Sequence, residues 1–173
     1  AEYVNVVFDC YRAGGALSFS KDGGFTATSQ HTNNNSRSMQ VSGSFDVEPE
    51  STKVVNSKTG IATFPKGTTD VTFKFATSYI SKNQANHNLE LEIPDGTSFD
   101  DVKNRAQKAW DEKCGIFEIE GATFNQLVTF YSCVYRLYSY PNLYSENSGT
   151  NDDPKWVYAS PYQNGKQMTG KMR

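Results

Sequence analysis

The sequence predicts a mainly β chain, a β-sandwich followed by helices. In the first 93 residues, apolar and polar residues alternate in several short runs, which is typical of strands that bury one face. Glycine pairs such as Gly23-Gly24 separate these runs and indicate tight turns. After Pro94 the apolar residues recur instead at intervals of three and four, the spacing of an amphipathic helix.

The strands are expected in order along residues 1–93, and no helix is expected before residue 95. From Ala1 to Tyr11, odd-numbered and even-numbered positions both carry apolar residues, as in a strand that is covered on both faces. The later runs alternate clearly, at 17–19, 25–27, 39–47, 71–79 and 89–93. In the last run Leu89, Leu91 and Ile93 are interpreted as the inward face of a strand. Several short strands at this spacing favour a sandwich.

Two helices are predicted after the sandwich. Ser98 and Asp101 form a capping box for a helix that ends near Gly115, and Thr123 and Gln126 form another for a helix that ends before Pro141. A brief strand is expected between them, over residues 116–120. From Asn142 onward the composition is that of loops, with a strand near residues 156–158. The last residues of the chain look unfinished, because they show no element with a buried face.

Composition excludes some classes of partner. The chain has 173 residues, a net charge of −2 and no basic cluster, so neither nucleic acid nor an anionic membrane is an expected partner. No run of 18 apolar residues predicts a membrane span. The start at Ala1 and the sequon Asn34-Asn35-Ser36 lean toward a processed, extracellular protein. The three cysteines leave two states open, one disulfide with a free thiol or three buried thiols.

Carboxylates are the main candidates for chemistry. Glu146, Asp152 and Asp153 lie in the loop after Pro141, where functional residues concentrate, although solvation alone also explains such side chains. Most other acidic residues are expected to form a solvated surface, namely Glu90, Glu92, Asp111, Glu112, Glu118 and Glu120. His31 and His87 have no second ligand at metal-binding spacing. A tyrosine series in the second helix follows one helical stripe, which favours core packing over sugar stacking, at Tyr131, Tyr135 and Tyr138.

The order of motifs resembles family 92 of the glycoside hydrolases, exo-acting calcium-dependent α-mannosidases. Five stretches carry the resemblance: Ser78-Tyr79-Ile80-Ser81 with Ala85 to Glu90, Ala109-Trp110-Asp111, Ile116 to Gly121, Phe130-Tyr131 with Tyr135, and Pro141-Asn142-Leu143-Tyr144-Ser145-Glu146 with Gly149. Pro161-Tyr162 also resembles the segment that leads into the next motif of the family. The resemblance extends over about residues 70–165. Two positions depart from it, because Arg136 replaces a usual histidine and Glu146 replaces a usual aspartate, which shifts the carboxylate by one methylene.

The resemblance implies a division of the chain. Residues 1–94 would be part of a β-sandwich, residues 95–141 a helical linker, and residues 142–173 the beginning of a helical (α/α)6 catalytic domain. The general acid, the general base and the calcium ligands would lie outside this chain, in the rest of that domain. Within the chain, Glu146, Ser145 and Asn142 are the expected contacts to the sugar, and Glu146→Gln is expected to lower activity while stability stays within about 1 kcal/mol.

The implied activity is the removal of terminal α-linked mannose, with α-1,2 as the expected linkage, from glycans. In an inverting hydrolase a base activates water and an acid protonates the glycosidic oxygen, and the resemblance adds calcium as the cofactor. The expected partners are mannose-containing glycans and the remainder of the catalytic domain, and the expected location is extracytoplasmic. The alternative is a non-catalytic β-sandwich that binds carbohydrate. Apolar stripes on both helices favour the hydrolase over the carbohydrate-binding alternative, because such stripes need another surface to cover them.

Overall fold

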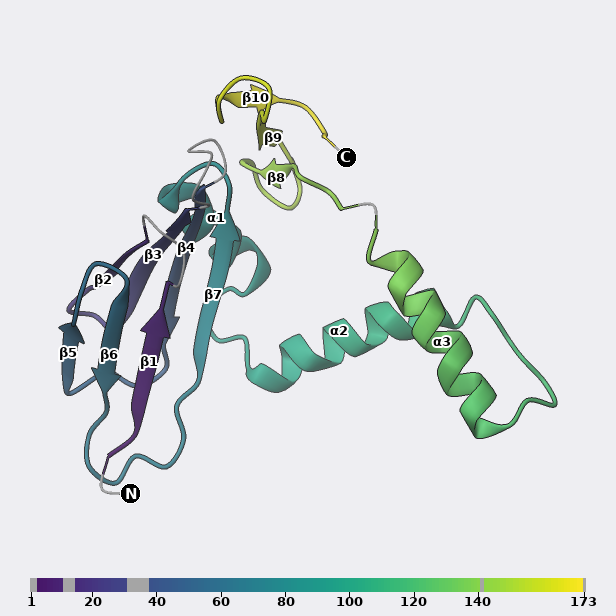
Figure 1. Cartoon of the computed structure of the whole chain (residues 1–173), viewed down its shortest axis with the longest axis horizontal. Coiled ribbons are helices and arrows are strands. Elements are labelled where there is room, and N and C mark those ends of the chain that lie inside the picture. Colours follow the sequence, from purple (N-terminus) through teal and green to yellow (C-terminus); the bar gives the residue numbers. More distant parts are fainter. Residues whose placement is uncertain (1–2, 11–14, 31–37, 141, 173) are drawn as a thin grey trace. The chain divides into compact units, whose positions relative to one another are not determined.

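The computed structural model describes residues 3–10, 15–30, 38–140 and 142–172 (Figure 1). The chain divides into two compact units, one formed by residues 1–95 together with 144–172 and the other by residues 96–143. His31, the sequon at residues 34–36 and Pro141 lie outside the described residues. Among the described residues, no helix has the length and apolar character that a membrane crossing needs.

Two antiparallel sheets form the sandwich of the first unit (Figure 1). A three-stranded sheet has the order β1-β6-β5, with β1 at Asn5–Asp9, β5 at Ser51–Val54 and β6 at Thr59–Thr63. A four-stranded sheet has the order β2-β3-β4-β7, with β2 at Ala16–Phe19, β3 at Gly24–Gln30, β4 at Ser38–Phe45 and β7 at Phe73–Ser78. The predicted fold class, a mainly β sandwich followed by helices, is confirmed.

An aromatic core joins the two sheets. Phe25 and Phe45 are buried on the inner face of the four-stranded sheet, and Phe64 follows β6. The ring of Phe8 in β1 packs against both Phe25 and Phe45, with centroid distances of 4.7 Å and 5.9 Å. At Gly43 there is no space for a side chain, because a Cβ atom would lie 2.4 Å from Cζ of Phe25. The apolar residues at alternate positions of 39–47 therefore point into the core, as expected.

The strand predicted at residues 89–93 is wrong, because these residues belong to α1, Lys82–Glu92, and its C-cap Ile93. Ser81 caps this helix by accepting from the N–H of Gln84 at 3.0 Å. Ala85 and Leu89 are buried one turn apart, so Leu89 packs as part of a helical face rather than an alternating one. Three apolar residues at alternate positions are too few to distinguish the two-residue period of a strand from the 3.6-residue period of a helix. The expectation of no helix before residue 95 fails for the same reason.

A small sheet completes the first unit, with the order β10-β9-β8. Its strands are β8 at Glu146–Asn147, β9 at Trp156–Ala159 and β10 at Gln167–Thr169. The strand predicted near residues 156–158 is confirmed, whereas β8 and β10 were not expected. Residues 144–172 thus belong to the same compact unit as the sandwich. That residues 142–173 begin an (α/α)6 domain stays a prediction.

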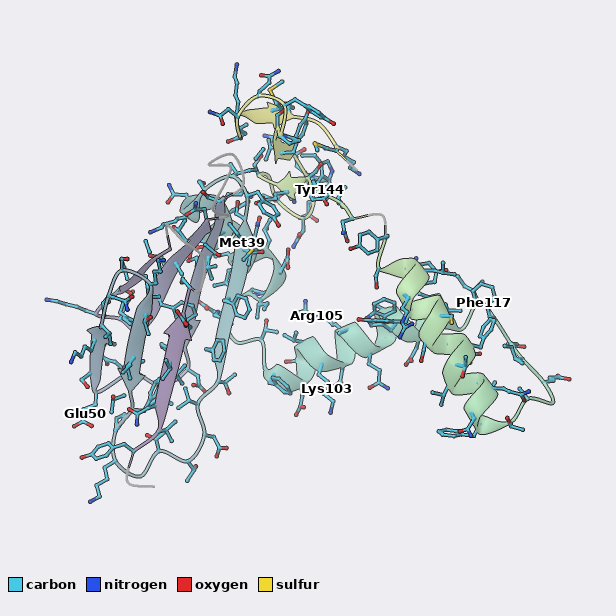
Figure 2. The ribbon with its side chains drawn as sticks, in the orientation of Figure 1. Met39, Glu50, Lys103, Arg105, Phe117 and Tyr144 are labelled. Atoms are coloured by element: carbon cyan, nitrogen blue, oxygen red, sulfur yellow. The ribbon has the colours of Figure 1, made fainter. Side chains whose placement is uncertain are left out.

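The second unit consists of α2 at Phe99–Cys114 and α3 at Phe124–Tyr138. Both predicted capping boxes are present, at Ser98 with Asp101 and at Thr123 with Gln126. The brief strand predicted at residues 116–120 is wrong, since this stretch pairs with no strand of the described chain. The carbonyl of Phe117, labelled in Figure 2, accepts instead from the hydroxyl of Tyr131 at 2.7 Å. α2 buries none of its own residues, so its apolar stripe stays largely exposed in this chain.

Candidate functional site

A polar cluster joins α1 to the β8 segment within the first unit. Three of its residues come from one face of α1 and three from residues 146–149. We call it the α1–β8 cluster, and it comprises Gln84, His87, Asn88, Glu146, Asn147 and Gly149. It brings together segments about sixty residues apart in sequence, including the stretches that carried the sugar-site prediction.

Glu146 uses both of its carboxylate oxygens inside the protein. Oε1 accepts from the backbone N–H of Tyr79 at 2.8 Å, just after β7 ends. Oε2 accepts from Nδ2 of Asn88 at 2.9 Å. A carboxylate that accepts two N–H donors holds both segments more strongly than a neutral acceptor does. Glu146 therefore fixes the start of β8 against the end of β7 and the middle of α1.

Asn88 is the centre of the cluster. Its Nδ2 also donates to the carbonyl of Thr77 at 3.0 Å, and its Oδ1 accepts from Nε2 of Gln84 at 2.8 Å. The same Nε2 donates to the carbonyl of Asn147 at 2.8 Å. Asn88 and Gln84 are both buried, so each of these bonds satisfies a group that water reaches poorly. The two amides sit one helical turn apart, which places them on the same face of α1.

Asn147 and Gly149 shape the loop that follows β8. Oδ1 of Asn147 accepts from the N–H groups of Gly149 at 2.8 Å and Lys155 at 2.9 Å. The carbonyl of Gly149 lies 2.7 Å from Nε2 of His87, and since a carbonyl only accepts, that ring nitrogen carries the proton. A Cβ atom at position 149 would lie 2.2 Å from the carbonyl oxygen of Asp153. Only glycine therefore fits this loop as it is folded.

That Glu146, Ser145 and Asn142 contact the sugar stays a prediction. Glu146 belongs to the α1–β8 cluster. Ser145 is buried and its hydroxyl accepts from the N–H of Met172 at 2.5 Å. Asn142 has an exposed side chain and lies in the second unit. Gln84 and Asn88 were missed as site residues, because no helix was expected before residue 95; the signal available was the i, i+4 spacing of two amides after the capping Ser81.

The other candidate groups have ordinary surroundings. Asp153 forms an exposed ion pair with Lys155 at 3.6 Å, and Glu90 accepts from Asn86 at 2.6 Å. All three cysteines are free thiols and Cys133 is exposed, so neither alternative from the sequence, one disulfide with a free thiol or three buried thiols, describes them. No group of three His, Cys, Asp or Glu residues that could hold a metal ion occurs among the described residues. That calcium is a cofactor, with its ligands outside this chain, stays a prediction.

The α1–β8 cluster contains one carboxylate, whereas glycoside hydrolysis requires two across the sugar. Its donors and acceptors are paired with one another or with neighbouring backbone groups, so the arrangement holds two segments in place rather than moving protons. The general acid and base predicted outside this chain stay predictions. What the cluster does determine is the position of residues 144–149 relative to the sandwich.

Comparison with known proteins identifies the family. The model of the catalytic domain of glycosyl hydrolase family 92 matches residues 84–172, just over half of the chain. The chain belongs to glycosyl hydrolase family 92. The match begins inside α1 and ends after β10, so both sides of the α1–β8 cluster lie within it. The resemblance stated from the sequence motifs is thereby confirmed.

Individual relatives agree with this assignment. A protein of the fungus Arthroderma benhamiae, named an uncharacterized secreted glycosidase, is 32% identical over 99 residues, which is 56% of this chain and 12% of the fungal protein. The structure of a family GH92 inverting mannosidase from Bacteroides thetaiotaomicron has a TM-score of 0.84 at 24% identity and covers 97% of this chain. A family GH92 α-mannosidase from the same bacterium has a TM-score of 0.67 at 16% identity over 91% of this chain. The chain spans only 25% and 23% of the two bacterial proteins.

Proposed function

We propose that this chain is the N-terminal portion of a longer glycoside hydrolase that removes terminal α-linked mannose, preferentially α-1,2-linked, with inversion at the anomeric carbon. Membership of family 92 supports the hydrolase class. The names of the two bacterial structures, an inverting mannosidase and an α-mannosidase, support the substrate and the stereochemistry. The small share of each relative that the chain spans supports the reading as one portion of the enzyme.

The α1–β8 cluster is the observation that carries the proposal. A free-standing carbohydrate-binding sandwich has no need to fix a second segment through six interlocked polar groups. Here the bonds of Glu146 and Asn88 hold residues 144–149 against α1, inside the span that matches the catalytic-domain model. Such a cluster suits a sandwich that positions the beginning of a catalytic domain.

In this role the chain supplies positioning, and the reacting groups come from elsewhere in the polypeptide. Inverting hydrolases place a general acid and a general base about 6.5–9.5 Å apart, which leaves room for the attacking water. We propose that both carboxyl groups, and the ligands of the calcium ion that would help to distort the sugar, lie outside residues 1–173. Glu146 and Ser145 then act as positioning residues, and the exposed Asn142 is left as the candidate for direct contact with a sugar hydroxyl.

The proposed partners are mannose-containing glycans and the remainder of the same polypeptide. The exposed apolar stripe of α2 supports the second partner, because a helix that buries none of its own residues gains stability when another surface covers it. A location outside the cytoplasm is consistent with the fungal relative, which is named a secreted glycosidase.

The test is hydrolysis of α-1,2-linked mannobiose followed by proton NMR of the anomeric products. We expect the full-length polypeptide to release β-mannose first, with slower release from α-1,3- and α-1,6-linked mannobiose. We expect the 173-residue chain alone to release none. Release of α-mannose first would contradict inversion, and binding of mannobiose without hydrolysis by the full-length polypeptide would favour the carbohydrate-binding alternative.

A further inference from the structure

An apolar groove runs along the free edge of β1, away from the α1–β8 cluster. It encloses about 550 Å³ between β1 and the strands β3, β4 and β7. Five consecutive residues line it on the β1 side, from Val6 through Val7, Phe8 and Asp9 to Cys10. Consecutive strand residues point to opposite faces. A groove that touches all of them therefore follows the backbone edge of the strand rather than one of its faces.

The backbone of β1 pairs with no described strand along this edge. Among the described residues β1 pairs only with β6. The carbonyl of Val4 accepts from the N–H of Phe64, and the N–H of Cys10 donates to the carbonyl of Lys58. These bonds place the even-numbered residues of β1 in its hydrogen-bonded pairs with β6. By the alternation of antiparallel ladders, the N–H and C=O groups of Asn5, Val7 and Asp9 then point to the free edge of β1, where Val7 and Asp9 line the groove.

The floor of the groove is an uncovered part of the inner face of the four-stranded sheet. Phe73 and Phe75 lie on the face of β7 that points into the core, yet 43% and 49% of their surfaces are exposed. The ring of Phe8 reaches the ring of Phe73, with centroids 6.1 Å apart, and β1 is the last strand of its sheet on that side. Met39, labelled in Figure 2, lines the same groove. Within the described part of the chain, no strand therefore lies beyond β1 to cover this side of β7.

We propose that this groove receives a β-strand from a segment of the same polypeptide outside residues 1–173. The strand pairs with the backbone of Asn5, Val7 and Asp9 and covers Phe73 and Phe75. Its sequence alternates, with apolar residues toward β7 and polar residues toward solvent.

Two observations favour this occupant over others. The chain spans only 25% of the bacterial inverting mannosidase, so relatives have ample further polypeptide to supply a strand. Natural proteins also cover or shorten exposed apolar edges, because such edges recruit other chains. A second copy that pairs edge to edge through β1 is the competing occupant, and the experiment separates the two.

The experiment is hydrogen exchange at single-residue resolution, on the full-length polypeptide and on the 173-residue chain. We expect the amides of Asn5, Val7 and Asp9 to exchange on the order of 100-fold more slowly in the full-length polypeptide. The amides of Val6 and Phe8, which bond to β6, are internal controls that are protected in both. Equal exchange of Val7 in the two proteins would overturn the proposal. Protection in the 173-residue chain that rises with its concentration, together with a dimer mass, would assign the groove to a second copy.

A pair of substitutions provides an independent readout. Val7→Pro removes an N–H that points into the groove, whereas Val6→Pro removes one that bonds to β6. We expect Val7→Pro to lower Tm in the full-length polypeptide more than in the 173-residue chain, and Val6→Pro to lower it in both. If the proline variants do not fold, Phe75→Ser gives the same comparison, because Phe75 is half exposed in this chain and would be covered in the longer one. Equal shifts in both proteins would contradict the added strand.

Discussion

Replacing Glu146 with glutamine separates a positioning role from a sugar contact. Glutamine keeps the shape of the side chain but presents one acceptor oxygen and one NH2 group. The carboxylate accepts from Tyr79 N–H at 2.8 Å and from Asn88 Nδ2 at 2.9 Å, so in the variant one donor must face another donor. Asn88 cannot turn over to relieve this, because its Nδ2 also donates to Thr77 and its Oδ1 accepts from Gln84.

The magnitude follows from these two bonds. A hydrogen bond to a charged acceptor contributes about 1.5–3 kcal/mol, and the partial exposure of Glu146 reduces it, so we expect Glu146→Gln to destabilise the chain by about 1–3 kcal/mol. For a chain of this size that lowers Tm by about 2–12 °C. This replaces the expectation from sequence that stability would change by no more than about 1 kcal/mol.

The assay is thermal unfolding of the 173-residue chain, followed by circular dichroism. Asp152→Asn is the matched control, because it makes the same chemical change at an exposed position in the loop after β8, and we expect a change within about 0.5 kcal/mol. A Tm for Glu146→Gln equal to that of Asp152→Asn would refute the positioning role. In a double-mutant cycle with Asn88→Ala, we expect a coupling energy of about 0.5–3 kcal/mol, as for residues in contact. A coupling energy near zero would also refute the positioning role.

Three further changes test other parts of the structure. Asn88→Ala removes one of the two acceptors of the buried Gln84 amide and the donor to Glu146 and Thr77, and we expect a loss of about 2–3 kcal/mol in the free energy of urea unfolding; a loss below about 0.5 kcal/mol would contradict the cluster. Gly149→Ala forces a Cβ atom against the Asp153 carbonyl, so proteolysis should cut the loop after β8 faster than in the parent chain, and equal cutting rates would be inconsistent with that contact. Two hydrogen bonds from Ser98 lower the pKa of Asp101, the larger effect coming from the hydroxyl and the smaller from the N–H. The stabilisation that Asp101 gives α2 is therefore complete above about pH 4 and is lost as the pH falls through the lowered pKa. NMR titration should show this pKa rising in Ser98→Ala, and an unchanged value would count against the capping box.

Local patterns in the sequence were sufficient for much of the fold. The alternation over residues 39–47 spans nine positions, long enough to separate a strand from a helix, and β4 lies there. Each capping box needs only two residues three positions apart, so Ser98 with Asp101 could be recognised without knowledge of anything distant.

Long-range contacts explain what the sequence could not provide. The residues of α1 have a weak apolar pattern, and the buried polar pair Gln84 and Asn88 gains its partners from residues 146–147, far along the chain. The role of Glu146 depends on the same contacts, which is why its loop context indicated only a sugar contact or a solvated side chain. Residues 116–120 have strand-like composition but no neighbouring strand among the described residues, and composition alone creates no pairing partner.

The intact mass of the native polypeptide tests the central claim most directly. The 173 residues account for 19.3 kDa, and the chain spans 25%, 23% and 12% of the three relatives described above. We predict a native mass several times larger, with residues beyond this chain supplying the acid, the base and the strand for the β1 groove. A native mass of 19.3 kDa would contradict the claim and leave a family 92 sandwich that carries no hydrolytic function of its own.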